Sequence, residues 1–170
     1  PRPGYDTWVS FAGQGKLIDP ELFEDGQLRR IRGYTTDLLN ERAVAFVARR
    51  RSRPFALFLA HKAVHPDLVQ RQDGTFDPES LGGYVPAERH RALYQGRQFP
   101  PRPNVRPVEE VLRSRPAFTE AFALRQGEPS QRLLRSILAG TQEEIRARAA
   151  MMAAVDEGVG MLLQALERGG

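Results

Sequence analysis

The most constraining stretch of the chain is a run of six consecutive apolar residues, Phe55–Ala60, which follows Pro54. The run is too short for a globular helix and opens after a proline, so it predicts a β-strand buried on both faces. In open α/β sheets, side chains just beyond the carboxyl end of such a strand lie in the crevice where ligands bind. His61, Lys62 and His65 occupy that place and are the candidate site residues.

Composition limits what this strand can belong to. With 170 residues, 41% of them apolar and 27% charged, the chain is long enough for one domain with a core. No stretch approaches the roughly 18–20 apolar residues that span a bilayer, and no targeting segment is visible, so localisation stays open. The start, Pro1–Gly4, is not typical of a translation start and indicates a piece of a longer protein. Without cysteine, the chain has no disulfide and no cysteine nucleophile.

The net charge of +4 rests on arginine, because only Lys16 and Lys62 are lysine among 25 basic residues. The arginines are spread along every segment, which is more typical of compositional bias than of a nucleic-acid footprint, so no nucleic-acid partner is expected. Lys62 stands out, since the compact point charge of an ammonium beside two histidines makes different contacts from those of a planar guanidinium fork. Chance is the competing explanation for this lysine.

Several elements can be placed from local signals. A short extended piece is expected at 7–11, followed by a hairpin with Asp25-Gly26 at its tip. A helix is expected to begin at Thr35, with a threonine as its N-cap, and to end in the basic run Arg49–Arg53. Helix, turn and buried strand together make an αβ unit of the doubly wound kind.

Residues 66–129 hold most of the chain's 13 prolines, and only Val108–Arg113 shows helical periodicity. So long a stretch with so little periodicity is typical of a functional excursion or a lid. Within it, Pro86–His90 is expected to start a short helical turn. Its Arg89, His90 and Arg91 either reach an anionic ligand or form a solvated basic turn, which is the commoner case.

The strongest helix signal closes the chain. Thr141–Glu144 is a capping box, after which apolar residues recur every three or four positions as far as Gly169. Gly158 and Gly160 each cost about 1 kcal/mol relative to alanine inside a helix, so close packing against a sheet is expected to compensate. Because no strand follows this helix, we expect an incomplete sheet with apolar faces left exposed.

Several strings occur in an order that resembles the sulfatases, and in particular the branch of N-acetylglucosamine-6-sulfatases and related bacterial enzymes. The most specific is His61-Lys62-Ala63-Val64-His65, and the others are Gly4–Phe11, Gly13–Gly15, Gly33–Asp37, Pro86–His90 and Ala154–Gly160. The resemblance implies a partial α/β fold of the alkaline-phosphatase type, a three-layer sandwich, that hydrolyses sulfate esters, with sulfated carbohydrate as the expected substrate. It also implies a periplasmic or secreted setting, a formylglycine nucleophile made from cysteine or serine, and a calcium ion on the sulfate oxygens.

By this resemblance His65 corresponds to the histidine that contacts the sulfate group, and it is the expected catalytic residue. Lys62 and His61 match the pattern of the branch and are expected to bind substrate with it, the alternative for His61 being a hydrogen-bonded core histidine. Charge that develops on a sulfate ester needs cationic or N–H donors, and an imidazole can also protonate the leaving group. Pro66 follows His65 at once, whereas family members often place a proline two residues later.

The chain departs from the family in what it lacks. It has no cysteine and no Ser-x-Pro-x-Arg string, and the family's Gly-Lys-x-His and Asp-Asn/His-Gly motifs are expected before Pro1 and after Gly170. We therefore expect one incomplete segment, 1–170, that supplies one wall of a sulfatase site without nucleophile or calcium ligands. Alone it is expected to be inactive.

Two other functions fit the residues. A non-catalytic, arginine-rich module would bind sulfated glycans or other polyanions through residues 66–129, with an affinity that falls steeply with salt whether or not His65 is present. A metal protein would need His61, His65 and His90 as ligands, but the first two follow a strand end and no spacing fixes the third.

Overall fold

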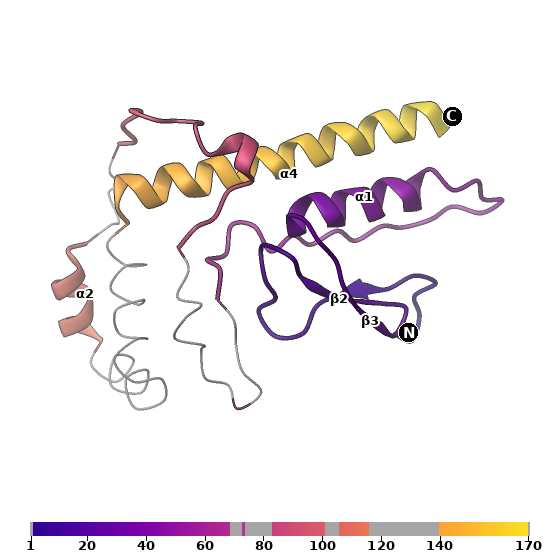
Figure 1. The fold of residues 1–170 in the computed structure, drawn as a ribbon, viewed down its shortest axis with the longest axis horizontal. Helices are drawn as coiled ribbons and strands as arrows, with labels where there is room; N and C mark the ends of the chain where they lie inside the picture. Colours follow the sequence, from indigo (N-terminus) through magenta and orange to yellow (C-terminus); the bar gives the residue numbers. More distant parts are fainter. Residues whose placement is uncertain (1, 69–72, 74–82, 101–105, 116–139, 170) are drawn as a thin grey trace.

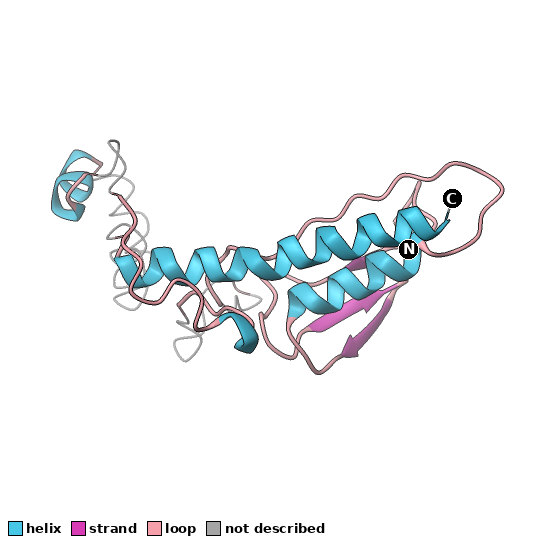
Figure 2. Ribbon diagram, turned by 90° about the horizontal axis from the view of Figure 1, so that it is seen from above, coloured by secondary structure: helices cyan, strands magenta, loops and turns pink. Residues whose placement is uncertain are grey.

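A computed structural model describes residues 2–68, 73, 83–100, 106–115 and 140–169. The elements in chain order are β1 (Val9–Ser10), β2 (Glu21–Glu24), β3 (Gln27–Arg30), α1 (Thr35–Val47), the single 3-10 turn η2 (Glu88–His90), α2 (Val108–Ser114) and α4 (Gln142–Gly169). The small sheet, α1 and α4 follow one another as layers in Figure 1, and α1 and α4 lie side by side in Figure 2 as well. Mixed helices and a small sheet agree with the predicted partial α/β class.

The three strands form one antiparallel sheet in the order β1-β2-β3. Its register pairs Val9 with Glu24, and Glu24 with Gln27 across the hairpin. Asp25 and Gly26 have φ angles of 50° and 92°, the left-handed backbone that a two-residue hairpin turn requires. The predicted hairpin and the predicted extended piece are both confirmed.

Both predicted helix starts are confirmed, but only one of the predicted caps. At α4, the Glu144 N–H donates to Thr141 Oγ1 at 3.2 Å, and the Thr141 N–H donates to Glu144 Oε2 at 3.0 Å. At α1 the predicted threonine cap is wrong, because Tyr34 is the N-cap and makes no side-chain cap bond. The Thr35 hydroxyl instead donates to the Lys16 carbonyl at 2.5 Å, which ties the start of α1 to the preceding loop.

The basic run after α1 caps the helix through one arginine. α1 ends at Val47, and the Arg51 guanidinium turns back to donate to the Phe46 carbonyl at 2.5 Å. The same guanidinium lies over the rings of Phe46 and Phe55. A cation at the last carbonyls of a helix satisfies orphan acceptors and complements the helix dipole.

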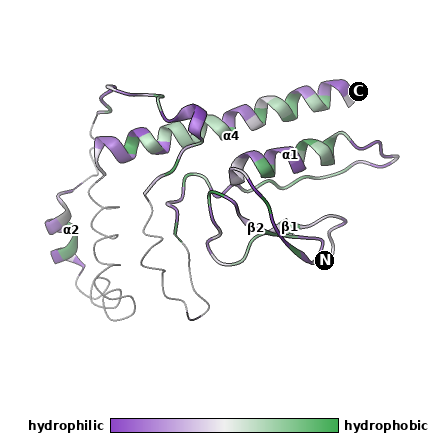
Figure 3. Cartoon of the chain, in the orientation of Figure 1, coloured by the Kyte–Doolittle hydropathy of each residue, from purple (hydrophilic) through white to green (hydrophobic). Residues whose placement is uncertain are grey.

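The strand predicted at Phe55–Ala60 is not formed. None of its backbone groups hydrogen-bonds to another residue in the described parts of the chain, and its side chains are largely exposed, Phe58 by 86%. Figure 3 shows the segment as an apolar trace that passes α1. A strand buried on both faces needs neighbouring strands and covering layers, and the described residues supply neither.

α1 and α4 approach each other closely through a glycine. Asn40 Nδ2 donates to the Ala154 carbonyl at 2.9 Å, and a Cβ atom at Gly158 would collide with the Asn40 amide. Close packing therefore does compensate the helix-propensity cost of Gly158, but the packing is against helix α1 and not against the predicted sheet. At Gly160 a Cβ would meet nothing within 4 Å among the described residues, so the packing predicted there is not found.

One apolar stripe of α4, away from its contact with α1, is exposed to solvent. Met152, Val159, Leu163 and Leu166 are between 47% and 55% exposed, which agrees with the exposed apolar face expected of an incomplete sheet. Contrary to the expectation from the sequence, α4 is long and apolar enough to cross a membrane by length and composition, a test that core helices of soluble proteins also pass. Its packing against α1 through Gly158 is that of a helix within a fold.

Half of the excursion predicted at 66–129 lies outside the described residues, so the prediction of a lid stays a prediction. Within its described parts, η2 is the predicted short helical turn, and α2 coincides with the stretch that has helical periodicity.

Gly158→Ala should lower the free energy of unfolding by about 1–3 kcal/mol, because the added methyl group overpacks the contact with Asn40. Gly160→Ala is the matched control and should raise that free energy by about 0.5–1 kcal/mol, since only helix propensity changes there. Urea unfolding followed by circular dichroism measures both. Equal changes in the free energy of unfolding for the two substitutions would contradict the close contact between Gly158 and Asn40.

Candidate functional site

The predicted site residues lie on or next to a turn, residues 62–67 (the site turn), which is held at both ends against residues 14–17 (the clamp loop). At one end, Lys62 Nζ donates to the Gln14 carbonyl at 2.7 Å. At the other end, the Leu17 N–H donates to Asp67 Oδ1 at 2.9 Å. Two side chains of the site turn thus hydrogen-bond to the backbone of the clamp loop, which lies about fifty residues earlier in the chain.

The site turn rests directly on the core. Ala63 and Val64 pack against a buried cluster formed by Leu17, Tyr34, Ala87, Met151 and Ala154. The clamp loop is joined to α1, because the Thr35 N–H donates to the Leu17 carbonyl at 2.9 Å. The turn is therefore fixed relative to both helices.

One contact sets the orientation of the half-buried His65 ring. Nδ1 lies 2.8 Å from the Pro66 carbonyl oxygen. Because a carbonyl only accepts, Nδ1 carries the proton, and Nε2 is the free nitrogen of the neutral ring. No group in the described parts of the chain hydrogen-bonds to Nε2. Nε2 is thus available to accept a proton from a bound group, or to donate one when the ring is an imidazolium.

Lys62 is 6% exposed, and its ammonium meets backbone carbonyls. Besides the Gln14 carbonyl, it donates to the Pro66 carbonyl at 3.3 Å. Burial lowers the pKa of Lys62, and the Asp67 carboxylate acts in the opposite direction. Two of its three N–H donors are used within the protein. Substrate binding by Lys62 stays a prediction.

His61 is half-buried, and its Nδ1 atom is buried without a partner among the described residues. Burial lowers the pKa of its imidazole, which favours the neutral ring. It is therefore not the hydrogen-bonded core histidine that was the alternative to a ligand contact. Its substrate contact stays a prediction.

Arg89 and His90, the other cations considered for an anionic ligand, are occupied by the fold. Arg89 donates to both carboxylate oxygens of Asp37 at 2.8 Å, and its Nε donates to Glu157 at 3.0 Å. His90 Nε2 lies 2.8 Å from the other oxygen of Glu157. These pairs join η2 to α1 and α4, so Arg89 and His90 are already paired with carboxylates. Arg89 and Arg91 stay exposed, as the predicted solvated turn requires.

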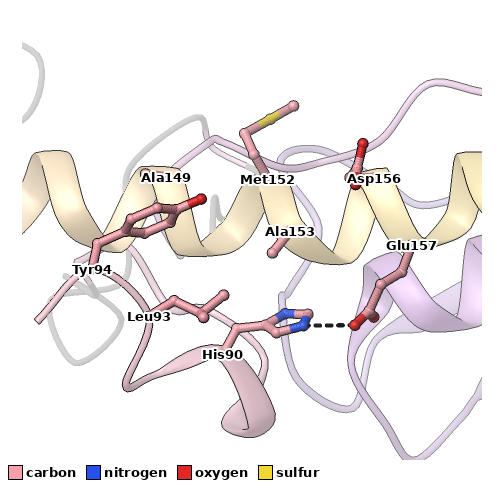
Figure 4. Close-up of a pocket in the computed structure, with 8 residues that line it drawn as sticks. All are labelled: His90, Leu93, Tyr94, Ala149, Met152, Ala153, Asp156 and Glu157. Atoms are coloured by element: carbon pink, nitrogen blue, oxygen red, sulfur yellow. Dashed lines mark hydrogen bonds and ion pairs between the residues drawn. The ribbon is translucent and has the colours of Figure 1, made fainter.

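A shallow groove of about 570 Å³ lies between η2 and α4 (Figure 4). It is lined by His90, Leu93, Tyr94, Ala149, Met152, Ala153, Asp156 and Glu157. Figure 4 shows His90 and Glu157 directed toward each other at one end, where their ring nitrogen and carboxylate are already paired. None of the predicted site residues lines this groove.

The described residues do not fit calcium. Among them, no three histidine, aspartate or glutamate side chains come together as a metal site requires, and the three histidines form no such group. The carboxylates of Asp37 and Glu157 both contact the Arg89 guanidinium, which already neutralises them.

Sequence reasoning missed the groups that hold the site turn and η2 in place. Asp67, the Gln14 carbonyl and Glu157 each find their partner 48 or more residues away, so no local spacing announces them. The one available signal was compositional, because Lys62 is one of only two lysines.

Comparisons with known proteins agree with the resemblance. No protein-family profile matches the chain. Over 101 residues it is 29% identical to an N-acetylglucosamine-6-O-sulfatase of Bacteroides thetaiotaomicron, an alignment that covers 57% of this chain and 15% of that protein. It also superimposes, with a TM-score of 0.65 and 23% identity, on the solved structure of BT4656 in complex with its substrate D-glucosamine-2-N,6-O-disulfate.

The resemblance to the sulfatases is confirmed. The structural match covers 100% of this chain and 42% of the solved one, so the sulfatase-like chain spans less than half the length of that relative. At this level of identity, the superposition shows a shared fold.

Arg89→Met should lower the free energy of unfolding by about 1–2 kcal/mol at neutral pH, because the guanidinium contacts to Asp37 on α1 and to Glu157 on α4 are lost. Hydrogen bonding to Arg89 lowers the pKa of Glu157, so this stabilisation is present above about pH 4.5 and is lost as the pH falls through the depressed value. The difference in the free energy of unfolding between wild type and Arg89→Met should therefore become smaller in acid.

Arg91→Met is the matched control for that measurement. Arg91 makes one exposed pair with Glu88, and its loss should change stability by less than about 0.5 kcal/mol. Urea unfolding at several pH values checks both variants. A difference for Arg89→Met that stays constant down to pH 3 would show that ion pairing is not its source.

Proposed function

We propose that this chain forms one wall of the active site of a sulfuric ester hydrolase that acts on sulfated sugars. The proposal draws on the two named relatives, one called an N-acetylglucosamine-6-O-sulfatase and the other solved with a disulfated glucosamine. The observation that carries it is His65, whose Nε2 atom is left free on a turn that is fixed at both ends. This histidine closes the string that most specifically resembles the sulfatases.

In this proposal His65 Nε2 faces the sulfate ester. As an imidazolium it donates to a sulfate oxygen, and when the sulfur–oxygen bond breaks it can pass its proton to the departing sugar oxygen. His61 is the second proposed contact, because it opens the same string and its ring is held by no hydrogen bond at Nδ1 among the described residues. Lys62 lies between these residues in the sequence, but its ammonium donates to the Gln14 and Pro66 carbonyls.

The proposal also concerns the rest of the fold. It assigns α1 and α4 to one outer layer of a three-layer sandwich of the alkaline-phosphatase type, with Phe55–Ala60 as a strand of the middle layer. The formylglycine nucleophile and the calcium ion would belong to parts of that fold outside the 42% that this chain matches. The 170-residue chain should then bind a sulfated sugar without releasing sulfate.

Polyanion binding without catalysis is the competing function, and the net charge of +4 is what favours it. Four described arginines lie over aromatic rings, among them Arg2 over Trp8 and Arg148 over Tyr84. Arg89 is likewise held by two carboxylates. The arrangement of the arginines therefore supports the sulfatase proposal more than a free basic surface.

The proposal predicts that D-glucosamine 6-sulfate binds at His65. Titration at fixed ionic strength, followed by the ring signals of the histidines in NMR spectra, should show saturable shifts for His65 and none with unsulfated D-glucosamine. His65→Ala should weaken binding by more than about tenfold, because a hydrogen bond to a charged group is worth about 1.5–3 kcal/mol.

Arg91→Ala is the control for net charge, and it should leave the affinity within about twofold. If the chain is instead a polyanion module, dextran sulfate should bind wild type and His65→Ala equally, with an affinity that falls steeply with salt. That result, together with unmoved His65 signals, would overturn the sulfatase proposal.

A further inference from the structure

The Pro66 carbonyl accepts hydrogen bonds from two side chains of the site turn. Lys62 Nζ approaches it at 3.3 Å and His65 Nδ1 at 2.8 Å. A carbonyl oxygen has two lone pairs, so both contacts can be made at once. The lysine and the histidine are therefore linked through one backbone oxygen, without touching each other.

The lysine is the fixed partner of the two. Its ammonium is buried and also donates to the Gln14 carbonyl at 2.7 Å, so its position is set from both sides of the turn. A buried cation that loses these acceptors is strongly penalised, which disfavours any conformation in which the Pro66 carbonyl turns away. Hydrogen bonds from a charged donor are also stronger than neutral ones.

The histidine depends on that carbonyl for its tautomer. If the Pro66 oxygen stays in place, Nδ1 must carry the proton and Nε2 is left as the outward nitrogen. If the carbonyl is free to rotate, nothing in the described parts of the chain holds either ring nitrogen. The ring would then exchange between tautomers as imidazole does in water.

We propose that Lys62 is a positioning residue, which fixes the Pro66 carbonyl and so holds His65 as the Nδ1–H tautomer with Nε2 free. What Nε2 meets rests on the proposed function, but the tautomer does not. Lys62 thus acts on the site through His65, in place of the substrate contact expected from the sequence. Lysine suits this role because its compact ammonium carries three donors that do not lie in one plane, whereas the donors of a guanidinium fork are coplanar.

Long-range proton–nitrogen NMR spectra of the uniformly labelled 170-residue chain test this directly. The chain has three histidines, which single His→Gln variants assign. At about pH 8.5, where imidazoles are neutral, wild-type His65 should show a protonated Nδ1 and an unprotonated Nε2. His90 is an internal control with the opposite tautomer, because its Nε2 atom faces the Glu157 carboxylate. A wild-type His65 protonated on Nε2 would overturn the proposal without any variant.

Lys62→Met should convert the His65 signals from a single tautomer to an exchange average while the His90 signals stay unchanged. Leu68→Ala is the control for general destabilisation, because it removes a buried side chain beside the site turn and leaves both Pro66 contacts. It should lower stability and leave the His65 tautomer intact. An unchanged tautomer in folded Lys62→Met, or the same loss in Leu68→Ala, would refute positioning by Lys62.

Binding of D-glucosamine 6-sulfate separates this proposal from the function it deepens. Lys62→Met should weaken binding by about 2- to 10-fold, less than His65→Ala does, since the histidine is still present but no longer held. If His65 has the expected tautomer but its signals do not move with the sulfated sugar, the positioning role stands and the sulfatase proposal fails.

Discussion

A single buried ammonium organises the candidate site. The Lys62 ammonium donates hydrogen bonds to the carbonyls of Gln14 and Pro66. Because the ammonium is buried, any conformation that removes these acceptors is unfavourable. At the other end of the site turn, the Asp67 carboxylate accepts a hydrogen bond from the Leu17 N–H. The position of His65 follows from these contacts, because its ring is bonded to one of the carbonyls that the ammonium fixes.

The parts of the fold that the sequence predicts well are those whose determinants lie within a few residues. The capping box of Thr141 and Glu144 and the Asp25-Gly26 turn are complete within four residues, and both occur as predicted. Phe55–Ala60 failed as a strand because pairing needs backbone partners from elsewhere, and the described residues provide none. Gly158 shows the same limit, since its contact is Asn40, 118 residues earlier.

The candidate site residues stay a prediction, but the structure shows what surrounds them. Reasoning from the end of an expected strand placed His61, Lys62 and His65 together, and the structure does bring them onto or next to one turn. The partners of Lys62 and Arg89 could not be inferred, because the Gln14 carbonyl and the carboxylates of Asp37 and Glu157 are distant in sequence. A cation in a sequence indicates charge, and only the fold shows whether that charge faces a ligand or a backbone carbonyl.

Two apolar surfaces are exposed in the described part of the chain. The uncovered stripe of α4 and the unpaired segment Phe55–Ala60 both present apolar side chains to solvent, while the site turn is fixed by hydrogen bonds. The described residues thus combine a rigid polar turn with faces suited to further packing.

The most direct test is a crystal structure of the chain grown with D-glucosamine 6-sulfate. We expect a sulfate oxygen at about 3 Å from His65 Nε2, with Nδ1 still on the Pro66 carbonyl. A sulfate group held by arginines away from the site turn, or a His65 ring turned so that Nε2 meets Pro66, would contradict the proposed site.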